Sequence, residues 1–268
     1  MNNFSKRLIF GIIYVLLIVI ATTTNMYVFY GLFFTFMLFS IYEFQQMLQF
    51  KSSTPYLFGI LILLASLFAH TNNSAIAKIL FIISLLSVFI AFIHTLLDEK
   101  KIAVAHLGKM ALTILYTIIP FLLIVELPLV TNNFNPKIVL GSFILVWSSD
   151  TFAYLVGRQF GKTKLFERIS PKKTIEGLIG GIFFTLVTAY ILSLFFTDTS
   201  LLQWLIISVI ISIFGVIGDL VESMFKRQAK VKDSSNLIPG HGGFLDRLDS
   251  IIFAIPFIYA FVYLTQTL

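Results

Sequence analysis

The chain has 268 residues, of which 58% are hydrophobic and 12% charged, with a formal net charge of +6 and a mean hydropathy of +0.95. Soluble domains carry about 25% charged residues, so this composition excludes a water-soluble globule and predicts an integral membrane protein. The chain contains no cysteine, which excludes disulfides, thiolate metal ligands and a cysteine nucleophile.

Long apolar runs, separated by Asn, Pro, Gly and charged residues, predict membrane-spanning helices. The first run follows Lys6 and Arg7 and lacks a small-residue cleavage pattern, so it is interpreted as a span and not as a signal peptide. The predicted fold is an all-α, polytopic helical bundle that forms a single membrane domain, residues 1–268. About nine spans are expected, at 8–24, 27–48, 55–70, 78–97, 110–130, 137–156, 177–196, 201–224 and 250–267.

The basic residues predict the orientation of these spans. Short cytoplasmic loops hold an excess of Lys and Arg. With a cytoplasmic N-terminus, all of the 19 basic residues except Lys78 and Lys137 fall on the cytoplasmic side. This alternation supports nine spans and a multi-pass protein of the inner (cytoplasmic) membrane, whose positive loops face anionic lipid headgroups.

The two halves of the chain differ in chemistry. Residues 1–136 are mainly hydrophobic spans, whereas residues 137–268 contain most of the charged side chains. Two cytoplasmic loops, 157–176 and 225–249, are longer and more polar than membrane insertion requires. The second half is therefore predicted to be catalytic.

Two carboxylates end apolar spans, where a charge costs a few kcal/mol unless it faces a partner or a wet cavity. Asp150 follows Ile144–Ser149, and Asp219 follows Ile211–Gly218. Either acid alone could be neutralised by a neighbouring lysine or protonated. Their position at the same side of the membrane favours a shared polar site.

Further acids and hydroxyls repeat at helical spacing beside these two. Asp219, Glu222, Ser223 and Lys226 occur at i, i+3, i+4 and i+7 and share one helix face, and Asp246 and Asp249 begin the last span. Carboxylates and hydroxyls are hard oxygen ligands, which suit Mg²⁺ in phosphoryl or nucleotidyl transfer better than zinc.

Two loop segments contain residues that suit phosphate. His241 lies among glycines whose backbone amides can approach an anion closely, although a flexible loop has the same composition. Ser170-Pro171-Lys172-Lys173-Thr174, followed by Glu176, reads as a phosphate clamp, although Thr174 could also simply cap the next helix.

The segment from Ser223 to Asp249 resembles, without a departure, the signature of the bacterial phosphatidate cytidylyltransferases, or CDP-diacylglycerol synthases. The residues around Asp150 and the 170–177 segment resemble two further elements of the same family. The resemblance implies a polytopic membrane enzyme that converts CTP and phosphatidic acid to CDP-diacylglycerol and pyrophosphate. It also implies a Mg²⁺ requirement, a cytoplasm-facing site and a homodimer, and no nucleic-acid partner is expected.

Residue roles follow from this resemblance together with the chemistry of the side chains. Asp219 and Asp246 are expected to hold Mg²⁺ and a possible second ion, with Asp249 and Asp150 as nearby metal ligands or as supports of the ligands. The predicted catalytic residues are Asp219, Asp246, Lys226, Arg227, His241 and Arg247. Substrate binding is assigned to Ser170, Lys172, Lys173, Thr174, Glu176, Ser223, Lys232, Gly242 and Gly243.

Three other functions compete with this reading. A CTP-dependent polyprenol or dolichol kinase would transfer the γ-phosphoryl group and release CDP. An ion-coupled transporter would use intramembrane acids for protons or cations, but the acids here gather at one face. A non-catalytic scaffold leaves the clustered acids unexplained.

Overall fold

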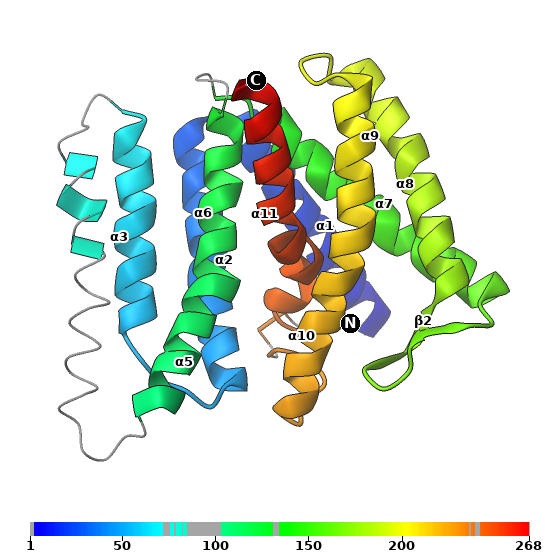
Figure 1. Ribbon diagram of the computed structural model, residues 1–268, viewed down its shortest axis with the longest axis horizontal. Helices are drawn as coiled ribbons and strands as arrows, with labels where there is room; N and C mark the ends of the chain where they lie inside the picture. Colours follow the sequence, from blue (N-terminus) through cyan, green and yellow to red (C-terminus); the bar gives the residue numbers. More distant parts are fainter. Residues whose placement is uncertain are drawn as a thin grey trace.

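The computed structural model describes residues 3–71, 76–77, 79–81, 83–84, 103–130, 134–235, 237–238 and 242–267 (Figure 1). Helices make up most of the described chain. Their bounds are α1 Asn3–Thr23, α2 Met26–Met47, α3 Thr54–Ala69, α5 Ala103–Thr113, η1 Ile114–Ile118, α6 Ile119–Glu126, η2 Leu127–Leu129, α7 Lys137–Phe160, α8 Ile175–Phe195, α9 Leu201–Ile210, η3 Ile211–Gly215, α10 Val216–Gln228 and α11 Leu245–Thr267.

The helices follow the predicted spans. Six helical runs in the described part of the chain are long and apolar enough to cross a membrane, and the apolar helices Leu8–Thr23 and Thr54–Ala69 are shorter. Every predicted span except 78–97 coincides with helix, and most of 78–97 lies outside the described residues. The all-α membrane class is therefore confirmed, while the count of nine spans stays a prediction.

One local element was not predicted. Strands β1 (Lys164–Phe166) and β2 (Ser170–Thr174) pair antiparallel, with Lys164 opposite Thr174 and Phe166 opposite Ser170. The all-α prediction is therefore incomplete in the first polar loop, where a short hairpin connects α7 to α8.

Polar side chains fix where several helices begin. The Asn25 side chain accepts hydrogen bonds from the amides of Tyr27 and Val28 at the start of α2. Ser200 and Gln203 form a reciprocal capping box at the start of α9. Such caps satisfy amides that the first turn of a helix leaves without an intrahelical partner.

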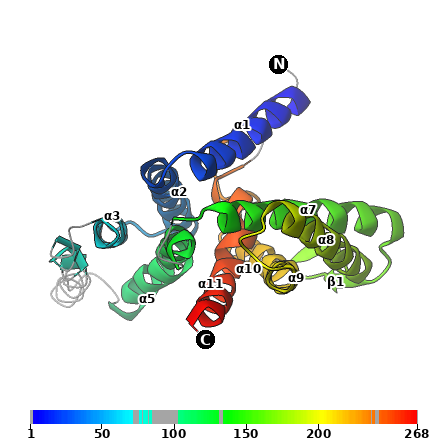
Figure 2. The ribbon, with the colours of Figure 1, turned by 90° about the horizontal axis from the view of Figure 1, so that it is seen from above.

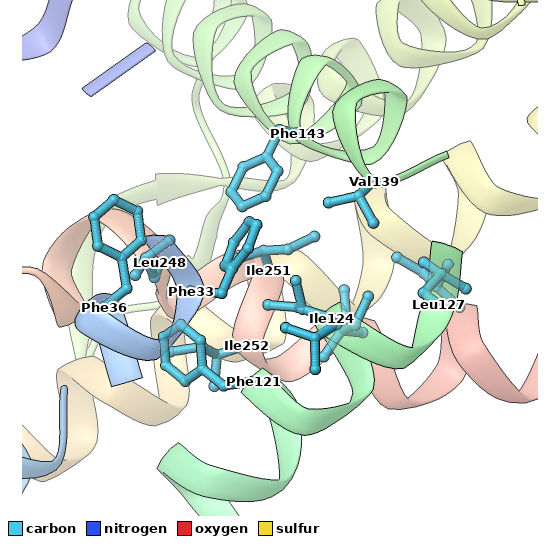
Figure 3. Packing of buried hydrophobic residues seen from close by; sticks show 14 of the residues in the cluster. Phe33, Phe36, Phe121, Ile124, Leu127, Val139, Phe143, Leu248, Ile251 and Ile252 are labelled. Atoms are coloured by element: carbon cyan, nitrogen blue, oxygen red, sulfur yellow. The ribbon is translucent and has the colours of Figure 1, made fainter. Parts of the chain in front are cut away.

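The core lies where α2, α6, α7 and α11 meet. Figure 3 shows Phe33 and Phe36 of α2 beside Phe121 and Ile124 of α6, with Phe143 of α7 and Ile251 of α11 completing the packing. Phe33, Phe121 and Ile124 are fully buried. Because lipid chains are as apolar as these side chains, close packing contributes to their association in a membrane more than transfer out of water does.

The remaining helices extend on both sides of this core. Seen from above, α1 runs diagonally away from the bundle, α3 lies at one side, and α7 and α8 lie together at the other (Figure 2). A Cβ atom at Gly180 of α8 would come within 2.6 Å of Val156 of α7. The missing side chain therefore lets these two helices approach closely.

The two ends of the bundle differ in charge. At one end, Lys137 lies 2.6 Å from Asp198, and this hydrogen bond and opposite charge lower the pKa of Asp198. At the other end lie the hairpin, the C-terminal end of α10 and the start of α11 (Figure 1). The second end holds the polar residues that the sequence singled out.

Candidate active site

Five parts of the chain converge on one cavity of about 780 Å³, here called the hairpin cavity. Its walls come from the C-terminal half of α7, the hairpin, the start of α8, α10 and the start of α11. The cavity brings together nine residues that the sequence assigned to the site. They are Asp150, Ser170, Lys172, Lys173, Thr174, Asp219, Asp246, Arg247 and Asp249.

The acids of the cavity have different hydrogen-bond partners. The Asp150 side chain is exposed, and no described residue donates a hydrogen bond to it. Asp249 Oδ1 accepts from the amide of Ser250 at 2.8 Å. Asp219 Oδ2 pairs with Lys173 Nζ at 2.6 Å, while its Oδ1 accepts from the hydroxyl of Ser223 at 3.2 Å. Asp150, Asp219 and Asp249 therefore keep oxygens that can accept a ligand.

Helix geometry explains how α10 presents Asp219. The helix that ends with α10 contains a π-helical segment, η3, between α9 and α10. A π turn inserts one residue into an α-helix and changes which side chains face a neighbouring element. The π segment packs against α7 and α11, one turn before Asp219, which lines the same cavity as Asp249.

The base of the hairpin is held by hydrogen bonds. The Thr174 hydroxyl accepts from the amide of Gly177 and caps α8. The Glu176 carboxylate accepts from the amides of Lys162 and Thr163 at 3.1 Å. Thr174 thus has both predicted roles, as a cap and as part of the cavity lining, whereas Glu176 holds the hairpin and does not line the cavity.

A second cavity, of about 520 Å³, lies between α1 and α7 and is here called the α1 cavity. Most of its wall is apolar and includes Leu8, Ile12 and Trp147. It reaches the same polar centre as the hairpin cavity, because both are lined by Asp150, Asp246, Arg247 and Asp249. Tyr14 of α1 donates a hydrogen bond to the carbonyl of Arg247 at 3.2 Å, which ties α1 to the start of α11.

Lys226 is buried beside the hairpin cavity. Its ammonium lies 2.6 Å from Glu222 Oε2 and 2.6 Å from Asp246 Oδ1, and it does not line the cavity. The side chain of Glu222 is fully buried. The predicted helix face of α10 therefore exists. Lys226 on this face pairs with Glu222 of the same helix and with Asp246 of α11.

Other predicted residues lie around the loop that precedes α11. Arg227 is exposed and donates to the carbonyl of Val231 at 3.4 Å, and Lys232 lines a separate surface cavity beside Tyr42. Gly242 has a φ of +84°, a conformation that glycine adopts without strain. Gly243 donates to Asp246. His241 lies outside the described residues.

The oxygen-rich donor set suits a hard cation such as Mg²⁺. Within the described ranges, however, no three His, Asp or Glu side chains are grouped closely enough to hold one ion. Mg²⁺ commonly uses one or two carboxylates and completes its coordination with water and substrate phosphates. Asp150, which is exposed, and the half-buried Asp219 and Asp249 fit that pattern.

Two kinds of residue at the site were not predicted from the sequence. Arg158 and Lys164 line the hairpin cavity but were counted only as orientation charges. Glu43 of α2 accepts hydrogen bonds from the loop before α11. Arg158 lies two helical turns after Asp150, and this spacing could have placed it at the site. No local sequence pattern marks Glu43.

Comparison with known proteins places these features in a family. The cytidylyltransferase family matches residues 5–265. The phosphatidate cytidylyltransferase of Staphylococcus haemolyticus is 37% identical over 206 residues, which cover 76% of this chain and 77% of that protein. The Bacillus subtilis protein of the same name is 36% identical over 82% of this chain and 83% of its own length.

The Staphylococcus aureus phosphatidate cytidylyltransferase is 41% identical over 170 residues, which cover 63% of this chain and 64% of that protein. These relatives confirm the family that the motif between Ser223 and Asp249 indicated. The chain belongs to the cytidylyltransferase family and is a nucleotidyltransferase.

Proposed function

We propose that the chain transfers a cytidylyl group from CTP to phosphatidate, forming CDP-diacylglycerol and pyrophosphate. One observation carries the proposal: the hairpin cavity and the α1 cavity meet at Asp150, Asp246, Arg247 and Asp249. A water-soluble nucleotide and a membrane lipid differ in every part except their phosphates. Two cavities of different polarity that meet at a charged centre match this pair of substrates.

The hairpin cavity suits the triphosphate. Lys172 is exposed on β2, and Lys164 lines the same cavity. Lysine ammonium groups bind phosphate as point charges, and the Arg247 guanidinium can donate a pair of hydrogen bonds. The hairpin therefore provides positive charge where CTP enters from water.

The α1 cavity suits the lipid. Its apolar wall can contact acyl chains, while its inner end reaches the acids and Arg247. A lipid that lies between α1 and α7 can keep its chains in hydrocarbon while its headgroup enters the polar centre. This arrangement explains why the active site is built into a membrane domain.

The reaction needs little proton transfer. A phosphatidate oxygen, already anionic at neutral pH, attacks the α-phosphorus of CTP, and the bond from that phosphorus to the bridging oxygen of the β-phosphate breaks. Pyrophosphate leaves with the electron pair. The protein then contributes mainly by placing two anions together and by stabilising the charge that develops on the leaving group.

Mg²⁺ is the proposed cofactor, held by one or two of the acids Asp150, Asp219 and Asp249 together with substrate phosphates and water. When bound, it neutralises phosphate charge. Asp246 has less capacity to bind a metal, because its Oδ2 accepts from Ser234 N, Ser234 Oγ and Gly243 N and its Oδ1 accepts from Lys226. We assign Asp246 to organising the start of α11.

The proposed location is the cytoplasmic membrane, with the site facing the cytoplasm. The distribution of basic residues supports this orientation, because several of them lie in or next to the hairpin and the end of α10, at one end of the bundle: Lys162, Lys164, Lys172, Arg227 and Lys230. The homodimer expected from the family resemblance stays a prediction.

The test is transfer of a label by the purified protein in detergent. Phosphatidate, Mg²⁺ and CTP labelled at the α-phosphate should yield labelled lipid and an equal amount of pyrophosphate, and EDTA should abolish both. CTP labelled at the γ-phosphate should leave the lipid unlabelled. Lipid labelled from the γ-position, with release of CDP, would establish a lipid kinase and overturn the proposal.

A further inference from the structure

Glu43 is a buried carboxylate in the second half of α2, and it is the one charged residue of this helix. Its side chain is fully buried. An isolated charge in such a place is costly, so a buried carboxylate needs hydrogen-bond donors. Nothing in the neighbouring sequence supplies them, because its partners lie about 190–200 residues further along the chain.

Four donors surround the Glu43 carboxylate. Oε1 accepts from the hydroxyl of Ser235 at 2.6 Å and from the amide of Phe244 at 2.9 Å. Oε2 accepts from the hydroxyl of Ser234 at 3.0 Å and from the amide of Leu245 at 2.8 Å. Each oxygen thus has one hydroxyl and one backbone donor, and the negative charge lies at the N-terminus of α11, where the helix dipole favours it.

These contacts hold the two ends of one segment together. Ser234 and Ser235 precede the segment that contains His241, and Phe244 and Leu245 follow it. A Cβ atom at Gly243 would lie 2.0 Å from Ser234 Oγ and 2.5 Å from each carboxylate oxygen of Glu43. The contact is therefore so close that residue 243 can have no side chain.

The same contacts continue to the polar centre. The amides of Ser234 and Gly243 donate to Asp246 Oδ2 at 2.9 Å and 2.8 Å. The Ser234 hydroxyl lies 3.0 Å from both Asp246 Oδ2 and Glu43 Oε2, so its one proton is shared between the two carboxylates. Asp246 and Arg247 follow Leu245 directly in the first turn of α11. Displacement of that turn would move both of them, and Asp249 one turn later, relative to the cavities.

We propose that Glu43 is a positioning residue for the transfer reaction: through Ser234, Ser235 and the start of α11 it fixes Asp246, Arg247 and Asp249 at the point where the two cavities meet. The proposal rests on the proposed function. It gives the N-terminal half of the chain a part in the chemistry, since α2 belongs to the half without signature motifs.

The alternative is that Glu43 only stabilises the fold. The variant Glu43→Gln separates these roles, because an amide keeps the size of the side chain but replaces one acceptor oxygen with a donor that faces a hydroxyl and a backbone amide. Glu126→Gln is the matched control. Glu126 accepts from Ser66 and from His70, in a polar cluster formed by α3 and α6 away from both cavities.

We expect Glu43→Gln to lower kcat roughly 10- to 100-fold, because misplacing a charged group by about an ångström has an effect of this size. The KM for CTP should change less than kcat, since the hairpin lysines that bind the triphosphate do not depend on Glu43, although Arg247 does. Glu126→Gln should lower thermal stability without lowering kcat. Ser235→Ala, which removes one of the four hydrogen bonds, should lower kcat less.

Hydrogen exchange tests the contact independently of catalysis. In the Glu43→Gln protein the amides of residues 243–246 should exchange faster than in the parent and the Glu126→Gln protein. An unchanged kcat in Glu43→Gln would overturn the positioning role. The same holds if Glu43→Gln and Glu126→Gln both lose activity in proportion to their loss of stability. If the parent protein transfers no cytidylyl group, the proposed function fails, while the exchange measurement still decides whether Glu43 holds this segment.

Discussion

Replacement of Lys226 with methionine tests whether this lysine is an ion-pair partner inside the protein or a ligand of substrate phosphate. The sequence predicted Lys226 as a catalytic residue, a role in which its ammonium would contact substrate phosphate. In the structure its ammonium lies 2.6 Å from both Glu222 and Asp246, and the exposed fractions of the three side chains are 11%, 0% and 8%. Methionine keeps the length of the side chain but removes the charge.

The expected loss in the free energy of unfolding follows from the two carboxylates that remain when Lys226 is replaced. Without Lys226, the Glu222 and Asp246 carboxylates are left close together with no cation between them, and removing one partner of a buried ion pair costs about 3–5 kcal/mol. For a chain of this size such a loss lowers the Tm by on the order of 10 °C. The double variant Glu222→Gln with Lys226→Met should recover part of the loss, because the repulsion between two acids is gone.

The assay is thermal unfolding in detergent, followed by the fluorescence of the two tryptophans, together with initial rates at varied CTP. Ion pairing predicts a lower Tm for Lys226→Met and partial rescue by the second substitution. A variant with unchanged Tm and a strongly raised KM for CTP would refute the reasoning and restore the role in phosphate binding.

Three further predictions follow from the site and the packing. Lys172→Ala should raise the KM for CTP roughly tenfold, the value of one charge-assisted hydrogen bond, whereas Lys51→Ala, an exposed lysine in another loop, should leave it unchanged. Asp150→Asn should raise the Mg²⁺ concentration for half-maximal rate, and an unaltered Mg²⁺ dependence would remove Asp150 from the proposed metal ligands. Gly141→Ala should lower the free energy of unfolding by about 1–3 kcal/mol, because its Cβ would lie 2.1 Å from Trp204. Gly31→Ala, which has open space around it, should leave the free energy of unfolding unchanged.

The sequence predicted the parts of the site that have a local signal. Asp150 and Asp219 each end an apolar run, where a charge is costly, and the structure brings both to the hairpin cavity. The Ser170–Thr174 segment, predicted as a phosphate clamp, lines the same cavity. The helices also have a local signal. An apolar run long enough to cross a bilayer must satisfy its backbone hydrogen bonds internally, and the α-helix does so.

The parts that the sequence could not predict depend on contacts between distant segments. The shared helix face of Glu222 and Lys226 was visible, but not that it is buried against Asp246 of α11. The hairpin was missed because its strands are only three and five residues long and the second of them, Ser170–Thr174, is polar and contains a proline. Glu43 is a single acid in an apolar span, and only the folded chain brings Ser234 and Ser235 to it.

The meeting of the two cavities has a consequence for the kinetics of the enzyme. Outside the four residues that they share, the hairpin cavity and the α1 cavity have separate walls, so nucleotide and lipid need not take turns at one entrance. Both substrates can be bound before any bond changes, and either can bind first. Double-reciprocal plots of rate against CTP concentration, measured at several phosphatidate concentrations, should therefore intersect, as in a ternary-complex mechanism. Parallel lines are the result when an enzyme carries the transferred group covalently between its two substrates.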